Sequence, residues 1–210
     1  MEGSLRQAGA QLRVAVQLVD ANTGAHLWAD TYNRPFRPDE IFDLHDELVP
    51  RIVPTVADWA GVLPRALSDA VRSKAVDALS PYEAVLRGCG YYQRVRPDEH
   101  AAVRQGLERA VEEAPRYADA WVMLSMICGE EHRFGFNVKP DPLGRALHAA
   151  RRAVDAAPSN HLSQLALAQA HYFRKELDAF RNAAERAVAL NPMDGFTVEY
   201  LGHLIAFAGD

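Results

Sequence analysis

The sequence lacks the features that would send a chain out of the cell or into a membrane. Its start, MEGSLRQAGAQL, has neither the charged segment nor the apolar segment of a signal peptide. The longest apolar run, AWVMLSMIC at 120–128, is about half as long as a membrane-spanning helix requires. We therefore expect a soluble, cytoplasmic protein that does not enter a membrane.

Cysteine is also scarce, and acidic residues outnumber basic ones. The two cysteines, Cys89 and Cys128, lie 39 residues apart in apolar, helical surroundings, which favours reduced, packed thiols over a disulfide or a metal pair. With 23 basic residues against 28 acidic ones, the net charge is −5. A chain built to coat nucleic acid or anionic lipid would carry a basic face. We therefore expect no direct binding to nucleic acid.

Motifs for catalysis, metals and cofactors are missing as well. The eight histidines include no pair with the spacing of a zinc site. The glycines at 88 and 90 lack the preceding strand and the third glycine of a dinucleotide loop. Glu130-Glu131-His132 has the composition of an acid–base set, but adjacent charges in a turn are usually solvated. We expect no metal, no cofactor and no enzymatic activity.

One repeated phrase stands out against this background. ERAVEEAP occupies 108–115, RRAVDAAP occupies 151–158 and ERAVALNP occupies 185–192. The second and third closing prolines are 34 residues apart, and the first and second are 43 apart. Because proline cannot continue a helix, each octet is expected to end one helix and turn the chain. A period near 34 in an alanine-rich sequence is typical of stacked helix-turn-helix units.

The unit at 159–192 resembles the tetratricopeptide repeat (TPR) family. Counted back from its closing proline, Ala168, Ala184 and Ala187 fall where that family places small residues, which let two antiparallel helices approach closely. Phe180 departs from the pattern, because the family usually has alanine there. It either fills a local gap or widens the helix pair.

Two earlier units follow the same pattern less regularly. The unit at 116–158 has the family's aromatic residue and leucine at Trp121 and Leu124, but a turn written GEEHRFGFNVKPDP makes it about nine residues longer than standard. Asp141-Pro142 is a good start for its second helix. The unit at 80–115 opens with the capping box Ser80-Pro81-Tyr82-Glu83.

The last stretch, 193–210, has the first helix of a further unit and no partner helix. Such arrays need a polar capping helix for solubility, so we expect the chain to be cut from a longer protein. We also expect self-association through apolar residues of this last helix, namely Leu201, Leu204, Ile205 and Phe207.

Residues 1–35 have the period of strands. QLRVAVQLVD alternates apolar and polar residues, ANTG at 21–24 supplies turn chemistry, and HLWADTY is the returning strand. EGSLR forms a third strand, with a turn at 8–10. This β meander, followed by DEIFDLHDEL, resembles the end of the TolB-like domain that precedes TPR units in many bacterial proteins. The resemblance implies a mixed α/β sheet whose earlier strands are missing here.

Residues 36–79 are predicted to be linker helices. The first has a helical stripe of apolar residues, and Pro50 and Pro54 are expected to kink or split it because each removes a backbone donor. A second helix is expected within 57–79. The stripe consists of Ile41, Phe42, Leu44, Leu48, Ile52 and Val56.

The predicted fold class is therefore mainly α: a TPR-type helix-turn-helix solenoid over 80–210, preceded by a small antiparallel β meander that is an α+β remnant. The resemblance implies a non-enzymatic scaffold that binds a protein or peptide through the concave face of its TPR helices. The alternative is the regulatory region of a larger signalling protein, either a class III nucleotide cyclase or a winged-helix transcription regulator. TolB-like and TPR segments also accompany kinase domains. No effector domain is visible in this chain.

The resemblance also places the residues that line the groove, on the first helix of each unit. These positions hold no lysine–asparagine set of the kind that clamps a terminal carboxylate, and they suit an apolar peptide face, with Tyr172 contributing about 2 kcal/mol. The alternative is that these side chains only pack on neighbouring repeats or on the turn at 129–142 folded into the groove. The predicted partner-binding residues are Val122, Met126, Leu165, Gln169, Tyr172, Phe173, Glu199 and His203, with Phe207 as a further position.

Overall fold

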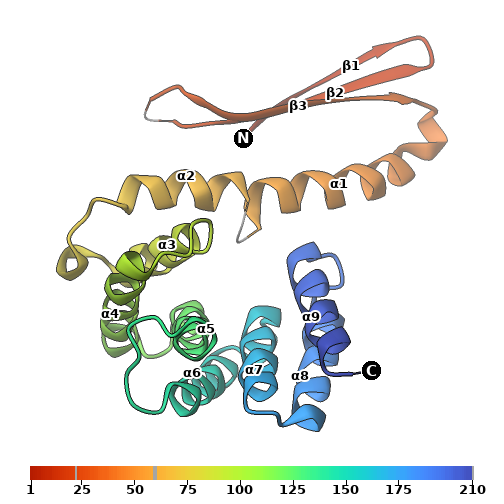
Figure 1. Ribbon diagram of the computed structural model, residues 1–210. Coiled ribbons are helices and arrows are strands. Elements are labelled where there is room, and N and C mark those ends of the chain that lie inside the picture. The colour runs from red at the N-terminus through yellow and green to blue at the C-terminus, as the bar shows by residue number, and fades with distance from the viewer. Residues whose placement is uncertain (22, 59–60, 210) are drawn as a thin grey trace. The chain divides into compact units, whose positions relative to one another are not determined.

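The computed structural model describes residues 1–21, 23–58 and 61–209. By its internal contacts the chain divides into two compact units, Met1–Leu67 and Ser68–Asp210. Figure 1 shows the strands in the first unit and most of the helices in the second. Each unit is described by itself below.

The first unit begins with a three-stranded antiparallel sheet. Strands β1 (Glu2–Ala8), β2 (Gln11–Val19) and β3 (His26–Pro35) lie in the order β1-β2-β3, as the period-two pattern predicts. Gly9 and Gly24 have positive φ angles of 58° and 71° in the two turns, where a residue without Cβ is favoured. The predicted turn ANTG includes Asn22, which lies outside the described residues.

A long helix follows the sheet, after the 3₁₀ turn Pro38–Glu40. Helix α1 (Ile41–Ala57) continues through Pro50 and Pro54, so the expectation that these prolines split it is wrong. Of its predicted apolar stripe, Leu48 and Val56 are buried, whereas Phe42 is exposed. An ion pair of 2.7 Å between Arg34 on β3 and Glu47 on α1 joins the helix to the sheet. Helix α2 (Val62–Val71) is shorter than predicted and precedes a second 3₁₀ turn, Val76–Ala78.

Helices of the second unit pack in two layers. Each contacts the next along the chain, and α3, α5, α7 and α9 also contact one another in succession, so they form one layer and α4, α6 and α8 the other. The protein is therefore mainly helical, with a small antiparallel sheet at its N-terminus (Figure 1). The bounds are α3 Pro81–Tyr91, α4 Pro97–Glu113, α5 Ala118–Phe134, α6 Pro142–Ala156, α7 His161–Phe173, α8 Leu177–Leu190 and α9 Gly195–Phe207.

The helix ends follow the local sequence signals. Helices α4, α6 and α8 each end two residues before the closing proline of an octet. The capping box of Ser80 and Glu83 is present at α3, with both reciprocal hydrogen bonds. Asp141 caps α6 by accepting a hydrogen bond of 3.0 Å from the backbone N–H of Gly144. Proline and capping chemistry therefore set these boundaries.

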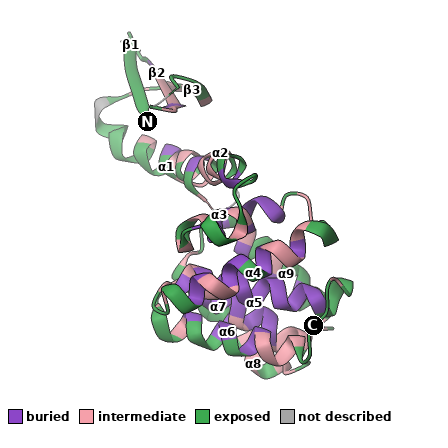
Figure 2. Cartoon of the chain, turned by 90° about the vertical axis from the view of Figure 1, so that its left-hand side faces the viewer, coloured by how far each residue is buried: buried purple, intermediate pink, exposed green. Residues whose placement is uncertain are grey.

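The core of the second unit depends on small residues and one large exception. Ala168, Ala184 and Ala187 are buried between α7 and α8, where their small side chains permit close packing. Phe180 is fully buried in the same cluster and its ring lies 5.3 Å from that of Tyr172. Phe180 therefore fills a gap in the core. Figure 2 shows how extensively α5 is buried between its neighbours.

The last helix is less exposed than its sequence suggests. Leu201 and Leu204 are buried against α7 and α8, whereas Ile205 is at the limit of exposure and Phe207 is 78% exposed. The prediction that all four residues are exposed is therefore wrong for Leu201 and Leu204. The face of α9 that packs on α7 and α8 is therefore buried, and Phe207 lies on a face that remains exposed.

Candidate partner-binding face

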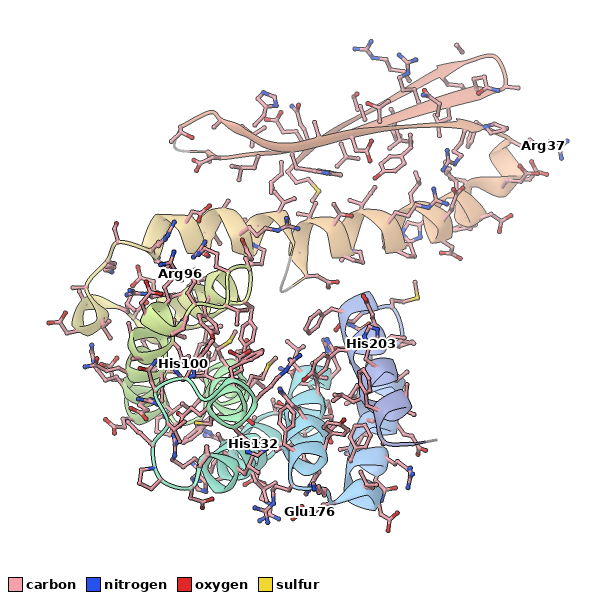
Figure 3. All side chains as sticks on the ribbon, in the orientation of Figure 1. Arg37, Arg96, His100, His132, Glu176 and His203 are labelled. Atoms are coloured by element: carbon pink, nitrogen blue, oxygen red, sulfur yellow. The ribbon has the colours of Figure 1, made fainter. Side chains whose placement is uncertain are left out.

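The predicted partner-binding residues separate into two groups by burial. Those on α5 and early α7 lie inside the helical array, so in this conformation their side chains contact neighbouring helices and offer a partner little surface. Tyr172 and Phe173 at the end of α7 are half-buried, and Glu199 and His203 on α9 are exposed. Figure 3 labels His203 on α9. The buried members are Val122, Met126, Leu165 and Gln169.

Aromatic rings of α7 form the accessible part of this face. The rings of Tyr172 and Phe173 lie 5.6 Å apart, and Tyr172 also contacts the fully buried Phe180. On α5, the His132 ring lies 6.0 Å from that of Phe173. Gly129 also faces the Phe173 ring, and a Cβ added there would meet it at 3.4 Å, an ordinary van der Waals contact. The half-buried rings are thus held in place by buried neighbours, which is how binding hot spots are built.

Beneath these rings lies a group of polar side chains, which we name the tyrosine–glutamate cluster: Tyr91, Tyr92, Glu130, Gln169 and Tyr200. The Tyr91 hydroxyl donates a hydrogen bond of 2.6 Å to Glu130, joining α3 to α5. Tyr92 and Tyr200, the latter on α9, lie close enough to Glu130 for its charge to raise their pKa, and Gln169 on α7 lies next to Tyr200. The cluster therefore connects all four helices of one layer.

Burial dominates the electrostatics of this cluster. Glu130 is only 4% exposed, and burial raises its pKa, although the hydrogen bond from Tyr91 and the charge of Arg133 oppose the rise. Burial likewise raises the pKa of Tyr200 to about 12, with the nearby Glu130 and Tyr172 acting in the same direction. The tyrosines therefore remain protonated donors at neutral pH and hold the Glu130 carboxyl between them.

Gln169 contributes a buried acceptor atom to this cluster. The Oε1 atom of Gln169 is buried and has no hydrogen-bond partner within the part of the chain that the structure describes. A buried acceptor without a partner costs free energy, so native structures contain few of them. Because Gln169 is only 5% exposed, a partner's donor would reach it only if a covering ring moved.

The structure corrects one interpretation of the sequence directly. Glu130-Glu131-His132 was expected in a solvated turn, but α5 continues to Phe134 and both glutamates are buried. The helix ends at Gly135, which has a φ of 69°, and not at Gly129. A signal for this existed, because Glu130 follows the predicted groove residue Met126 by four positions and so shares its helix face.

The second glutamate fixes the extended turn. Glu131 pairs with Arg104 on α4 at 2.7 Å and with Arg145 on α6 at 2.5 Å, and it accepts a hydrogen bond of 2.8 Å from the backbone N–H of Lys139. Asn137 donates a hydrogen bond to the carbonyl of Pro97 at the start of α4. The turn at 135–141 therefore packs on α4, which belongs to the other layer.

The structure also bears on three other features: a metal site, reactive thiols and a membrane-spanning helix. Among the residues that the structure describes, no group of three or more histidine, cysteine and carboxylate side chains is placed to hold a metal ion. Cys89 and Cys128 are buried free thiols, and burial raises the pKa of Cys89 to about 11 and that of Cys128 to about 12. Within 1–21, 23–58 and 61–209, no helix combines the length and apolar character that crossing a bilayer requires.

Comparison with known proteins gives one informative similarity. No protein-family model matches the chain. The chain is 29% identical over 186 residues to a protein of Rhizobium meliloti (strain 1021) named "Putative adenylate cyclase 3". The match covers 87% of this chain and 30% of that protein. This chain therefore spans less than a third of the length of its relative.

Proposed function

We propose that this chain is a non-enzymatic TPR-type module that binds a protein or peptide partner through the layer formed by α3, α5, α7 and α9. The observation that carries the proposal is the half-buried aromatic pair Tyr172 and Phe173, which is supported from below by buried residues and lies on the same layer as the exposed Glu199 and His203. The 34-residue spacing and the stacked helix pairs support the TPR assignment.

The chemistry of this face favours an amphipathic partner segment. Aromatic side chains supply contact area at low conformational cost, and the two polar residues of α9 can fix the segment's orientation. A groove that clamps a terminal carboxylate would need cationic side chains at the predicted positions, which here are apolar, aromatic, amide, carboxylate or histidine side chains.

Site-specific photocrosslinking in the native host would test the binding face. A benzoylphenylalanine placed at Tyr172 is expected to crosslink one defined protein, and the crosslink should be lost when Glu199→Lys and His203→Ala are introduced together. The matched control carries the crosslinker at Glu185, an exposed position on α8 in the other layer, and is likewise measured with and without the two substitutions. Equal crosslinking from both positions would reject this face as the binding site.

A second candidate function follows from the similarity to the Rhizobium meliloti protein. We propose that the module regulates a nucleotide cyclase domain within a longer protein, because the match covers 87% of this chain and only 30% of that relative. A winged-helix effector is the other possibility that the sequence leaves open. The binding face would then contact the effector domain, or transmit a partner's binding to it.

A chimera would test the regulatory candidate. The matching segment of the Rhizobium meliloti protein is replaced by this chain, and cyclic nucleotide formation is measured with and without Glu199→Lys and His203→Ala. We expect turnover in the chimera, a changed rate in the variant, and no turnover from the isolated chain. A folded chimera whose rate is insensitive to these substitutions would contradict regulation through this face. Turnover by the isolated chain would contradict its non-enzymatic character.

A further inference from the structure

A small pocket lies between the end of α2, the end of α3 and the start of α4, away from the tyrosine–glutamate cluster. We name it the arginine pocket. Its volume is about 90 Å³. All of its lining residues belong to the second unit, and three of the five are arginines: they are Ser68, Arg72, Arg87, Arg94 and Glu99.

The pocket concentrates positive charge in a chain whose net charge is −5. Against three guanidinium groups its lining contains one carboxylate, Glu99, so the lining carries two more positive charges than negative ones. Asp69 is the other acidic group nearby; it lies 4.0 Å from Arg94 and is 70% exposed, so water screens its charge. An excess of cationic groups around a cavity attracts an anion.

Glu99 neutralises these arginines only loosely. Its two carboxylate oxygens lie 3.5 Å from Arg72 and 3.4 Å from Arg94, whereas Arg104 and Glu131 meet at 2.7 Å. Charge-assisted hydrogen bonds are normally about 2.7–2.9 Å long. A guanidinium carries five N–H donors, so Arg72 and Arg94 have donors that Glu99 does not engage. They are therefore available to a further anion.

The walls of the pocket are held in position by specific contacts. Arg87 donates a hydrogen bond of 2.9 Å to the carbonyl of Lys74, and Lys74 pairs with Glu83 at 2.8 Å. Gly90 lets α2 and α3 approach closely, since a Cβ there would lie 2.0 Å from the Ser68 hydroxyl. The arginines are thus arranged before any ligand binds, which lowers the cost of binding.

We propose that the arginine pocket binds a phosphate group, either as free phosphate or on a small organic phosphate. A pocket of about 90 Å³ has room for a tetrahedral oxyanion. A phosphate dianion balances the excess of two positive charges, whereas a carboxylate balances one. Guanidinium groups also match phosphate oxygens in two-point hydrogen bonds.

Calorimetric titration of the whole chain would test this site. Inorganic phosphate and phenyl phosphate are titrated at pH 8 and constant ionic strength, where both are dianions, with benzoate as the carboxylate comparison. We expect Arg87→Gln and Arg94→Gln each to weaken phosphate binding about tenfold, because each removes a charged donor. Glu99→Gln should strengthen binding severalfold, because it removes the competing carboxylate.

Arg96→Gln is the matched control, since Arg96 is exposed, pairs with Asp98 and does not line the pocket (Figure 3). Binding of either phosphate compound supports the site, and the tighter of the two identifies the source of the phosphate. The proposal is overturned if neither binds, if benzoate binds as tightly, if Arg96→Gln weakens binding as much, or if Glu99→Gln weakens it. Arg72→Gln replaces any arginine variant that circular dichroism shows to be unfolded.

Discussion

At the scale of single residues, Glu130 shows how burial determines the behaviour of a carboxyl group. It lies inside the helical array with the Tyr91 hydroxyl 2.6 Å away, and burial raises its pKa. A raised pKa in the folded state means that the neutral form is favoured there. The contribution of Glu130 to stability is therefore fully present below its unfolded pKa and is lost as the pH rises through the folded value.

The direction of this pKa shift predicts how the stability of Glu130→Gln depends on pH. Because glutamine stays neutral and can still accept the hydrogen bond from Tyr91, the variant should gain thermal stability relative to the wild type as the pH rises from 4 to 8. At pH 4 the difference should be smallest. Thermal unfolding across this range checks it, with the exposed Glu199→Gln as the control. A wild-type advantage that grows with pH would contradict the buried position of the carboxyl group.

Phe180 offers a test of core packing at the same scale. It is fully buried among small residues, so Phe180→Ala should leave a cavity and cost about 3–5 kcal/mol in the free energy of unfolding. Leu190→Ala on the same helix is the control, because Leu190 is exposed. Chemical denaturation measures both. A cost below about 1 kcal/mol for Phe180→Ala would mean that the helix pair closes over the gap.

At the scale of elements, α5 and the turn after it form the most strongly connected part of the second unit. Burial by itself would raise the pKa of Glu131, but hydrogen bonds from Arg145, the Lys139 N–H and Arg104 outweigh it and lower the pKa. The stabilisation from Glu131 is therefore present above its unfolded pKa and is lost as the pH falls through the folded value. Glu130 and Glu131, adjacent in sequence, thus respond to pH in opposite directions.

Glu131→Gln should release the turn at 135–141 from α4. It removes the closest carboxylate of the buried Arg104, which then has only the weaker contact with Glu108 at 3.8 Å, so we expect a loss of about 3–5 kcal/mol at pH 7 and faster amide hydrogen exchange at Lys139. Glu113→Gln is the control, since Glu113 is on the same helix as Arg104, pairs with Arg109 near the surface and should cost less than about 1 kcal/mol. Unchanged exchange in Glu131→Gln would show that other contacts hold the turn.

At the scale of the whole molecule, the chain is two compact units that span 30% of the length of its Rhizobium meliloti relative. We expect the exposed face of α9 to mediate self-association. Phe207 is 78% exposed on it, and Ile205 adds further apolar surface, whereas Leu201 and Leu204 are buried. Contact between two copies would remove this apolar surface from water.

Phe207→Ser is expected to weaken self-association. Sedimentation velocity over a range of concentrations should show the wild type associating and the variant shifted toward monomer, because the variant removes the most exposed apolar ring of α9. Phe42→Ser is the control, since Phe42 is equally exposed but lies on α1 in the other unit. A wild type that stays monomeric at high concentration would contradict the prediction. An equal effect of both variants would show that association is nonspecific and not mediated by α9.

Much of the local structure could be predicted from the sequence, because it depends on near neighbours. The three strands follow the period-two pattern, and α4, α6 and α8 stop before Pro115, Pro158 and Pro192 as proline chemistry requires. The wrong predictions concern helices that were expected to break at a proline or a glycine. Helix α1 continues through Pro50 and Pro54, and helix α5 continues past Gly129, although each of these residues locally disfavours a helix.

Which groove residues reach solvent was decided by the tertiary structure. The repeat register places Val122, Met126, Leu165 and Gln169 on one helix face, but only the packing of α3, α5, α7 and α9 determines that this part of the face is covered while Tyr172 and Phe173 stay half-buried. The arginine pocket is likewise invisible in sequence, because its arginines come from three segments. Period and capping act over a few residues, so the sequence determined them; burial, charge pairing and cavities depend on residues far apart in the chain, so only the folded chain decided them.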